Sequence, residues 1–195
     1  MNFDFHCHSN ASDGVLAPSA LAQRAASNGV EHWALTDHDV LTGLAEARAT
    51  AAQLSLSFYD GIEISITWRG QTIHIVGLDI DPSNAALIAG IEGVRSERGT
   101  RAERIADQLT AAGIPGTLAG AYRYADDPQM VGRTHFARYL VEVGRAPDVA
   151  AVFQHYLSPG KPGYIEHSWA TLAQAVDWIR AAGGLAIIAH PGRYK

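Results

Sequence analysis

The chain has 195 residues, of which 47% are hydrophobic and 18% are charged. This composition excludes a disordered protein and fits one domain, or one domain with an insertion. The 15 basic and 20 acidic residues give a net charge of −5, which excludes a global attraction to nucleic acid or anionic lipid. The single cysteine excludes a disulfide framework and a multi-cysteine zinc site. No run is apolar enough for a membrane span or a signal peptide, so we expect a cytoplasmic protein.

The first 78 residues alternate between predicted strands and helices. Strands are expected at 2–8, 31–36, 56–65 and 72–78, with a turn at Arg69-Gly70 before the last of them. One helix begins at Pro18 and stops at Asn28-Gly29, and a second helix runs from a Thr42 cap to about residue 53. This alternation favours an α/β sheet or barrel built from βα units.

The middle of the chain predicts helices only, at 83–112, 117–125, 134–143 and 147–156, followed by a loop at 158–163. A helix capped by Thr171 and a short buried strand at 185–189 then resume the earlier pattern. We therefore expect a barrel formed by residues 1–78 and 164–195, interrupted by a helical insertion at 79–163.

The first candidate site residues are two histidines that stand two positions apart. In a strand, residues i and i+2 point to one face, so the imidazoles of His6 and His8 would converge and form half of a metal site. Cys7 would point the other way, into the core. Two ordinary surface histidines are the alternative.

Carboxylates and a further histidine follow later predicted strands. Asp37, His38 and Asp39 end the second strand, where barrel enzymes place their chemistry, and both aspartates are also typical of turns or caps. Glu63 lies between isoleucines, so its carboxylate needs a partner, which a bridging metal or an arginine would supply.

Four more residues could take part in the same chemistry. Taken singly, Asp13 is typical of a turn and His74 of a core position in a strand. His135 lies at the start of a predicted helix, and His190 ends a predicted strand. Together with the histidine pair they predict a multinuclear site of imidazole and carboxylate ligands. Such ligands suit Zn, Mn or Fe, and the lack of thiolates favours a hydrolytic site over a structural one.

Five motifs in order, Phe5 to Ser9, Asp13-Gly14, Leu35 to His38, Gly61 to Glu63 and Ala189 to Arg193, resemble those of the PHP (polymerase and histidinol phosphatase) family. The resemblance implies a distorted (β/α)7 TIM-like barrel with two to three divalent ions, Mn²⁺ expected first and Zn or Fe as alternatives. The ligands it implies are His6 and His8 for one metal, Glu63 as a bridge to a second metal held by His74 and His135, and Asp13 and His38 for a third.

The long insertion, Gly132 to Phe136 and Gly160 to Tyr164 look most like the 3′,5′-nucleotide bisphosphate phosphatase and RNA 5′-end exonuclease branch. That likeness implies a metal-dependent phosphoesterase acting on compounds such as 3′-phosphoadenosine 5′-phosphate and on short RNA, with no stable protein partner. The insertion would be a lid, with Tyr122, Tyr124 and Phe136 as candidates for stacking a base. The residues suited to phosphate are Arg133, Lys161, His190 and Arg193, with His190 also a candidate general acid.

One departure from the family pattern is that no late Asp-x-His follows His190, and we expect the barrel to be incomplete in this chain. A histidinol-phosphate phosphatase and a PHP module that has lost catalysis are the two alternatives that the sequence leaves open.

Overall fold

The computed structural model describes residues 1–194, which form two compact units. The first unit contains Met1–Val94 and the chain from Ser168 onward, and the second unit is Arg95–His167. The division falls within one helix, α3 (Ala85–Ala111), so it lies later in the chain than the predicted insertion boundary at residue 79.

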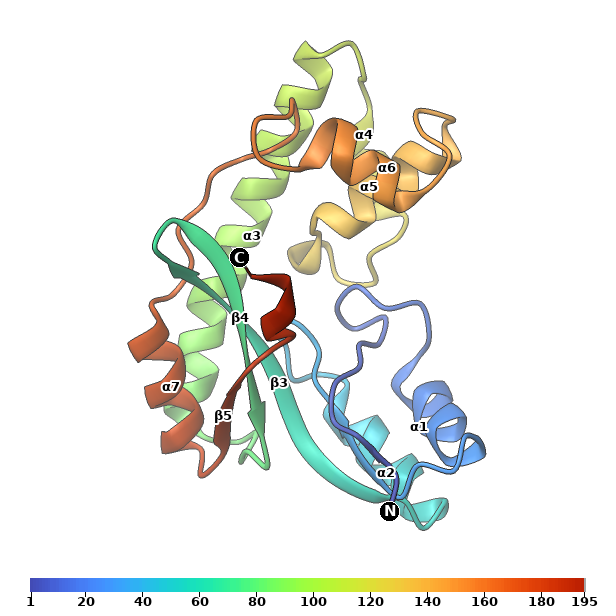
Figure 1. Ribbon diagram of the computed structural model, residues 1–195, viewed down its shortest axis with the longest axis vertical. Helices are drawn as coiled ribbons and strands as arrows, with labels where there is room; N and C mark the ends of the chain where they lie inside the picture. Colours follow the sequence, from blue (N-terminus) through green and yellow to red (C-terminus); the bar gives the residue numbers. More distant parts are fainter. Residues whose placement is uncertain (195) are drawn as a thin grey trace. The chain divides into compact units, whose positions relative to one another are not determined.

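The first unit is built on a curved five-stranded sheet with strand order β1-β2-β3-β4-β5 (Figure 1). The strands are β1 (Phe3–Asp4), β2 (His32–Leu35), β3 (Ser57–Trp68), β4 (Gln71–Leu78) and β5 (Leu185–Ile188). The first three are parallel, whereas β4 is antiparallel to both of its neighbours. The mixed α/β class is confirmed. The predicted turn at Arg69-Gly70 is confirmed too: both residues have positive φ values, 49° and 76°, and they join β3 and β4 as an antiparallel hairpin.

Two strand predictions need correction. The first strand ends at Asp4 instead of continuing to residue 8, although Thr36 N–H still donates to the Cys7 carbonyl at 3.1 Å. The strand at 185–189 is not buried: Leu185 and Ile188 are 68% and 56% exposed. Its burial pattern follows from its position, because within residues 1–194 β5 pairs with β4 alone.

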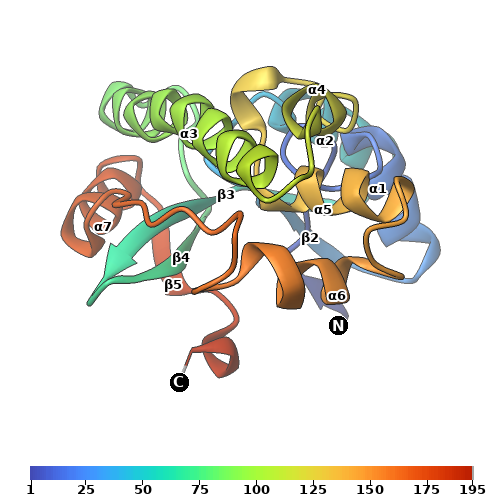
Figure 2. The same cartoon turned by 90° about the horizontal axis from the view of Figure 1, so that it is seen from above.

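Helices α1 (Pro18–Ser27) and α2 (Leu44–Gln53) lie together beside the parallel part of the sheet (Figure 2). Small alanines such as Ala22 and Ala47 let both helices approach Trp33 of β2 closely, and all three side chains are buried. The predicted first helix is confirmed. The second helix begins at Leu44 with Gly43 as its N-cap, so the predicted Thr42 cap was wrong.

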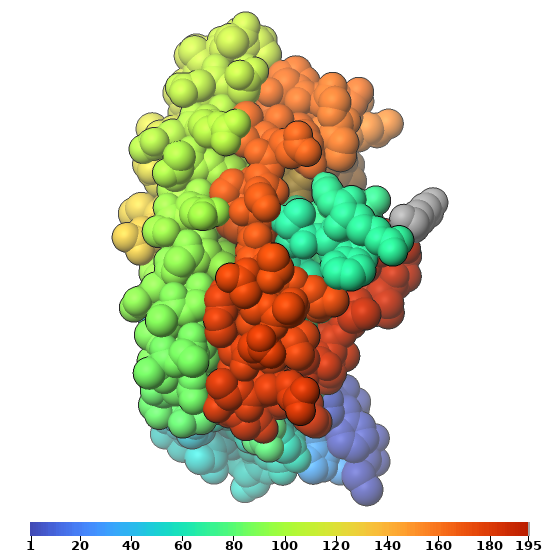
Figure 3. All heavy atoms as spheres, turned by 90° about the vertical axis from the view of Figure 1, so that its left-hand side faces the viewer, coloured from blue at the N-terminus to red at the C-terminus, as the bar shows by residue number. Residues whose placement is uncertain are grey.

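The isoleucines of β3 contact the first part of α3 and helix α7 (Leu172–Ala181), whose side chains lie against each other in Figure 3. Thr171 caps α7 as predicted, since its hydroxyl accepts from Gln174 N–H at 3.2 Å. Because side chains alternate along a strand, Glu63 points to the face opposite Ile62 and Ile64. Because the isoleucines occupy the face of β3 that packs in this core, the Glu63 carboxylate points away from the core.

The second unit is helical, as predicted. It contains the rest of α3, α4 (Thr117–Tyr122), a 3₁₀ turn at Pro128–Met130, α5 (Arg133–Glu142), α6 (Val149–Val152) and a π-helical turn at Phe153–Leu157. Phe136 is fully buried in the core of this unit, so it cannot stack on a base. Tyr124 donates its hydroxyl proton to Glu142. None of the helices in the described part of the chain is long and apolar enough to cross a bilayer.

Candidate metal centre

Strands β3 and β4 place the two innermost members of the site. His74 lies opposite Ser65 in the antiparallel register, so its side chain shares a face with Glu63 two residues away. The distance from His74 Nδ1 to Glu63 Oε1 is 3.2 Å, and the Glu63 side chain is fully buried. A hairpin of ordinary geometry therefore brings an imidazole to a buried carboxylate.

The segment after β1 supplies two more imidazoles. His6 Nε2 and His8 Nε2 lie 3.2 Å and 3.1 Å from the same oxygen, Oε2 of Glu63. The strand ends before them, but the alternation of side chains persists because Cys7 still hydrogen-bonds to Thr36 through its N–H and its carbonyl. The structure thus brings both members of the histidine pair to one point.

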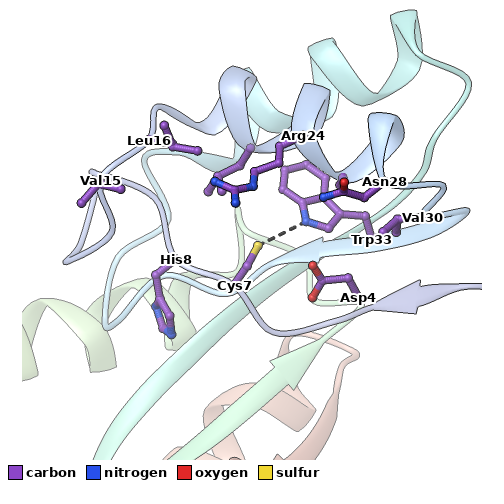
Figure 4. Close-up of a pocket in the computed structure, with 11 residues that line it drawn as sticks. Asp4, Cys7, His8, Val15, Leu16, Arg24, Asn28, Val30 and Trp33 are labelled. Atoms are coloured by element: carbon purple, nitrogen blue, oxygen red, sulfur yellow. Dashed lines mark hydrogen bonds between the residues drawn. The ribbon is translucent and has the colours of Figure 1, made fainter.

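Cys7 points away from this site, as its position between the two histidines suggests. Its sulfur accepts from Trp33 Nε1 at 3.2 Å and lies 3.4 Å from the Ala34 carbonyl, beside a cavity of about 240 Å³ (Figure 4). Burial, opposed only in part by the Trp33 hydrogen bond, raises the pKa of the thiol to about 12. The thiol is therefore a core group and not a nucleophile at neutral pH.

The segment after β2 continues beside β3 and adds His38. Asp39 N–H donates to the Glu63 carbonyl at 3.0 Å, and Glu63 N–H donates to the Asp37 carbonyl at 3.1 Å. Through this backbone pairing His38 Nδ1 lies 3.2 Å from Glu63 Oε2.

The side chain of Asp37 organises the loop that carries Asp13. Its carboxylate accepts from Ser9 N–H at 2.7 Å, from the Ser9 hydroxyl at 2.6 Å and from the Ser12 hydroxyl at 2.5 Å. The next residue in this loop, Asp13, has its Oδ1 4.0 Å from His8 Nδ1. Asp37 thus acts as the predicted turn residue, and the turn it stabilises presents Asp13 beside His8.

The end of β5 completes the cluster with His190. Ala189 N–H donates to the His74 carbonyl at 3.0 Å, and His190 then turns inward with a φ of 33°. Its Nε2 lies 2.9 Å from Glu63 Oε1. The chain continues through a 3₁₀ turn that contains Arg193, and the Tyr194 hydroxyl accepts from His74 N–H at 2.9 Å.

Five imidazole nitrogens therefore surround one carboxylate, three at Oε2 and two at Oε1. Burial favours the neutral acid, but the imidazoles, His6 first among them, outweigh it and hold the pKa of Glu63 well below its usual range. Burial and the neighbouring His8 lower the pKa of His38 to about 3. Burial opposes protonation of His8 too, yet the hydrogen bond and charge of Glu63 raise its pKa.

The donor set fits divalent metal ions. The described residues offer no hydrogen bond of acceptable geometry to five buried atoms of the cluster: His8 Nδ1, His38 Nδ1, His74 Nδ1, His190 Nδ1 and Glu63 Oε2. Buried polar atoms need partners, and one carboxylate cannot satisfy five rings. Two groups, His6-Glu63-His190 and His8-His38-Glu63, each bring three ligand atoms within 4.8 Å of one another. Imidazole and carboxylate donors at such spacing are typical of transition-metal sites.

The sequence signature of the PHP domain matches residues 4–182. The chain belongs to the PHP domain family. Its motif resemblance to this family is thus confirmed. The matched region contains Glu63 and four of the five histidines around it, while His190 lies eight residues beyond its end.

Similar proteins agree with this assignment. The chain is 52% identical over 193 residues to a 3′,5′-nucleoside bisphosphate phosphatase of Chromobacterium violaceum, covering 99% of this chain and 68% of the relative. It is 44% identical over 193 residues to a 5′-3′ exoribonuclease of Haemophilus influenzae, covering 99% of this chain and 70% of the relative. A solved amidohydrolase structure from Chromobacterium violaceum, with bound sulfate and no metal, has a TM-score of 0.97, 51% identity and coverage of 99% and 68%. The chain spans about two thirds of the length of these relatives.

Three of the predicted site residues belong to the second unit. His135 is the third residue of α5 and fully buried, and its Nδ1 accepts from Gly132 N–H at 3.0 Å. Arg133 begins α5, donates to the Leu157 carbonyl at 3.2 Å and lies over the Phe153 ring. Lys161 is exposed in the loop that follows the π-helical turn. The remaining cation predicted to bind phosphate, Arg193, lies in the first unit three residues after His190.

Two structural features, one in each unit, were not predicted from the sequence. The carboxylate of Asp39 accepts from the Ser65 N–H at 2.7 Å and from the Ser65 hydroxyl at 2.8 Å, which links the His38 segment to β3. The other feature is a pair of buried arginines on α3, Arg98 and Arg101. Their signal was present as arginines at every third position from residue 95 to residue 104, a pattern that usually marks a solvated helix face.

Proposed function

We propose that this chain is the metal-binding part of a phosphoesterase that hydrolyses a phosphate monoester of 3′,5′-nucleotide bisphosphates. One observation carries the proposal: five imidazoles converge on the buried Glu63 carboxylate. The 52% identity to a nucleoside bisphosphate phosphatase supports the choice of substrate.

Two to three divalent ions would be held by His6, His8, Asp13, His38, Glu63, His74 and His135, with Mn²⁺ expected first and Zn or Fe as alternatives. When bound, such ions supply a deprotonated water at neutral pH and neutralise the charge of a phosphate ester. The residues of the chain contribute the rest. Glu63 stays ionised in its buried position and fixes the orientation of the surrounding rings, which pre-organises the site.

His190 is a further candidate metal ligand. Burial lowers the pKa of His190, so its imidazole is neutral at pH 7. A neutral ring is the form that ligates metal, whereas a general acid must carry a proton. Its position 2.9 Å from Glu63 therefore favours ligation over the general-acid role expected from the sequence.

The substrate phosphates would be bound by the guanidinium groups of Arg133 and Arg193, because a guanidinium pairs with phosphate through two hydrogen bonds, and by Lys161 as a point charge. The helical segment at 79–163 would act as the lid that selects the substrate. We further propose that the first unit is part of a (β/α)7 barrel and that the protein is cytoplasmic.

A second candidate activity is removal of nucleotides from the 5′ end of short RNA, supported by the 44% identity to a 5′-3′ exoribonuclease. Both activities cleave a phosphate ester beside a nucleoside, so one site can serve both.

The test is a phosphate-release assay with Mn²⁺ that compares 3′-phosphoadenosine 5′-phosphate, AMP, histidinol phosphate and 5′-phosphorylated short RNA. We expect the bisphosphate and the RNA to be the best substrates. Arg193→Ala should lower kcat/KM by about 10- to 150-fold, because a charge-assisted phosphate contact is worth roughly 1.5–3 kcal/mol. Arg180→Ala, at an exposed position on α7, is the matched control. A preference for histidinol phosphate would contradict the proposed substrate, and no turnover of any substrate with metal bound would favour a catalytically inactive module.

A further inference from the structure

Asp39 is a buried carboxylate beside the metal centre that the proposed ligand set leaves out. It follows His38 directly in the chain and is fully buried, yet it belongs to neither of the two ligand groups around Glu63. A buried carboxylate is unfavourable unless hydrogen bonds compensate for the water it has lost. The hydrogen bonds that Asp39 accepts therefore indicate what it does in the fold.

Both oxygens of the Asp39 carboxylate bind one residue of β3. Oδ1 accepts from the Ser65 N–H at 2.7 Å, and Oδ2 accepts from the Ser65 hydroxyl at 2.8 Å. Ser65 lies two residues from Glu63 on the same face of β3, and it stands opposite His74 in the register with β4. Two hydrogen bonds to one residue fix both the position and the orientation of the carboxylate. The side chain of Asp39 thus joins its segment to the strand that carries Glu63.

The backbone of Asp39 has an uncommon conformation at the same place. Its φ is 50°, in the left-handed region that residues other than glycine rarely adopt. Its N–H donates to the Glu63 carbonyl at 3.0 Å. Such a conformation persists only where the surrounding structure fixes it, and the bonds to Ser65 and Glu63 do so. Because His38 is the preceding residue, these bonds also determine where the His38 ring lies.

The His38 ring is closely surrounded by other members of the cluster. Its centroid lies 4.5 Å from that of His8 and 4.7 Å from that of His74, and its Nδ1 is 3.2 Å from Glu63 Oε2. A metal site requires its ligands to be held within about 0.5 Å of the productive geometry. Loss of the Asp39 bonds would therefore disturb metal binding without removing any ligand.

We propose that Asp39 is a positioning residue, which holds the His38 ring where the His8-His38-Glu63 group can bind a divalent ion. The inference rests on the proposed metal-binding function. The effect is confined to one ion, because the other ligand group around Glu63 does not contain His38. Removal of the Asp39 side chain therefore weakens the binding of one ion and spares the rest.

The test measures how many divalent ions the full chain retains and how tightly it binds them. The parent and its variants are loaded with Zn²⁺ and dialysed for metal analysis, and the affinity for each ion is measured by titration against a chelator. Asp39→Ala should retain one ion fewer than the parent, as His38→Ala should. Its affinity for that ion should fall by about 10-fold or more, with parental affinity for the others. Asp39→Asn, which keeps an oxygen for the Ser65 N–H, should recover part of the lost affinity.

Asp81→Ala is the matched control. The carboxylate of Asp81 accepts from the N–H and the hydroxyl of Ser83 at 2.9 Å and 2.6 Å, but it is exposed and lies outside the ligand groups around Glu63. This variant should retain as many ions as the parent, with the same affinities. Ser65→Ala removes only the hydroxyl bond to Asp39, so it should weaken the same ion about 3-fold, and it serves if Asp39→Ala does not fold.

The outcomes separate a positioning role from a purely structural one. A folded Asp39→Ala protein with the metal content and affinities of the parent, whatever its loss of stability, would overturn the inference without affecting the proposed function. Loss of every ion in that variant would also overturn it, because the effect would not be confined to the group that contains His38. A parent that binds no ion would refute the proposed function, and the inference with it.

Discussion

Glu63 shows how a single residue can be both unfavourable for burial and essential to a site. Its carboxylate is fully buried on β3, where desolvation alone would keep it protonated. The surrounding imidazoles reverse this preference, and the charge of Glu63 in turn affects the pKa of each imidazole. Glu63 raises the pKa of His8 against the effect of burial, whereas burial and His8 lower the pKa of His38 and keep its ring neutral.

This coupling predicts how the stability of the metal-free chain depends on pH. Because the pKa of His38 falls to about 3 in the folded state from about 6.5 in the unfolded state, its contribution is full above pH 6.5 and is lost as the pH falls toward 3. Between pH 7 and pH 5 this amounts to about 2 kcal/mol. Urea unfolding of the EDTA-treated parent and of His38→Asn at both pH values checks it: the parent should lose more stability on acidification. Equal losses in the two proteins would contradict the assignment.

At the level of helices and strands, close packing sets where glycine is required. Gly90 of α3 faces α7, and a β-carbon there would lie 2.3 Å from the Trp178 ring. Gly93, one turn later on the same helix, has no atom within 4 Å of the corresponding point.

These two glycines form a matched pair of substitutions. Gly90→Ala should destabilise the chain by about 1–3 kcal/mol, because Trp178 must move out of its packed position. Gly93→Ala should stabilise it by about 0.5–1 kcal/mol, because alanine is the better helix former. The free energy of unfolding in urea measures both. A stable Gly90→Ala protein would show that α7 does not pack against α3 in this way.

Across the whole molecule, the elements with strong local sequence signals were predicted correctly. The predictions failed where the environment of a residue depends on partners far along the chain. The Thr171 cap and the Asn28-Gly29 stop are local and were correct. The exposure of β5 depends on which strands lie beside it, which its apolar sequence cannot reveal. The convergence of the His6-His8 pair on Glu63 followed from strand periodicity together with family motifs. The buried arginines of α3 were missed because their spacing resembles that of a solvated face.

Metal binding by the Glu63 cluster is the central claim, and metal analysis of the purified full chain tests it most directly. The parent and Glu63→Gln are incubated with Mn²⁺ or Zn²⁺, dialysed to remove loosely bound ions, and measured by inductively coupled plasma mass spectrometry. The parent should retain one or more divalent ions per chain, and Glu63→Gln should lose most of them, because the substitution removes the central negative charge with little change in shape. A parent that retains no ion, or a Glu63→Gln protein with the metal content of the parent, would contradict the account.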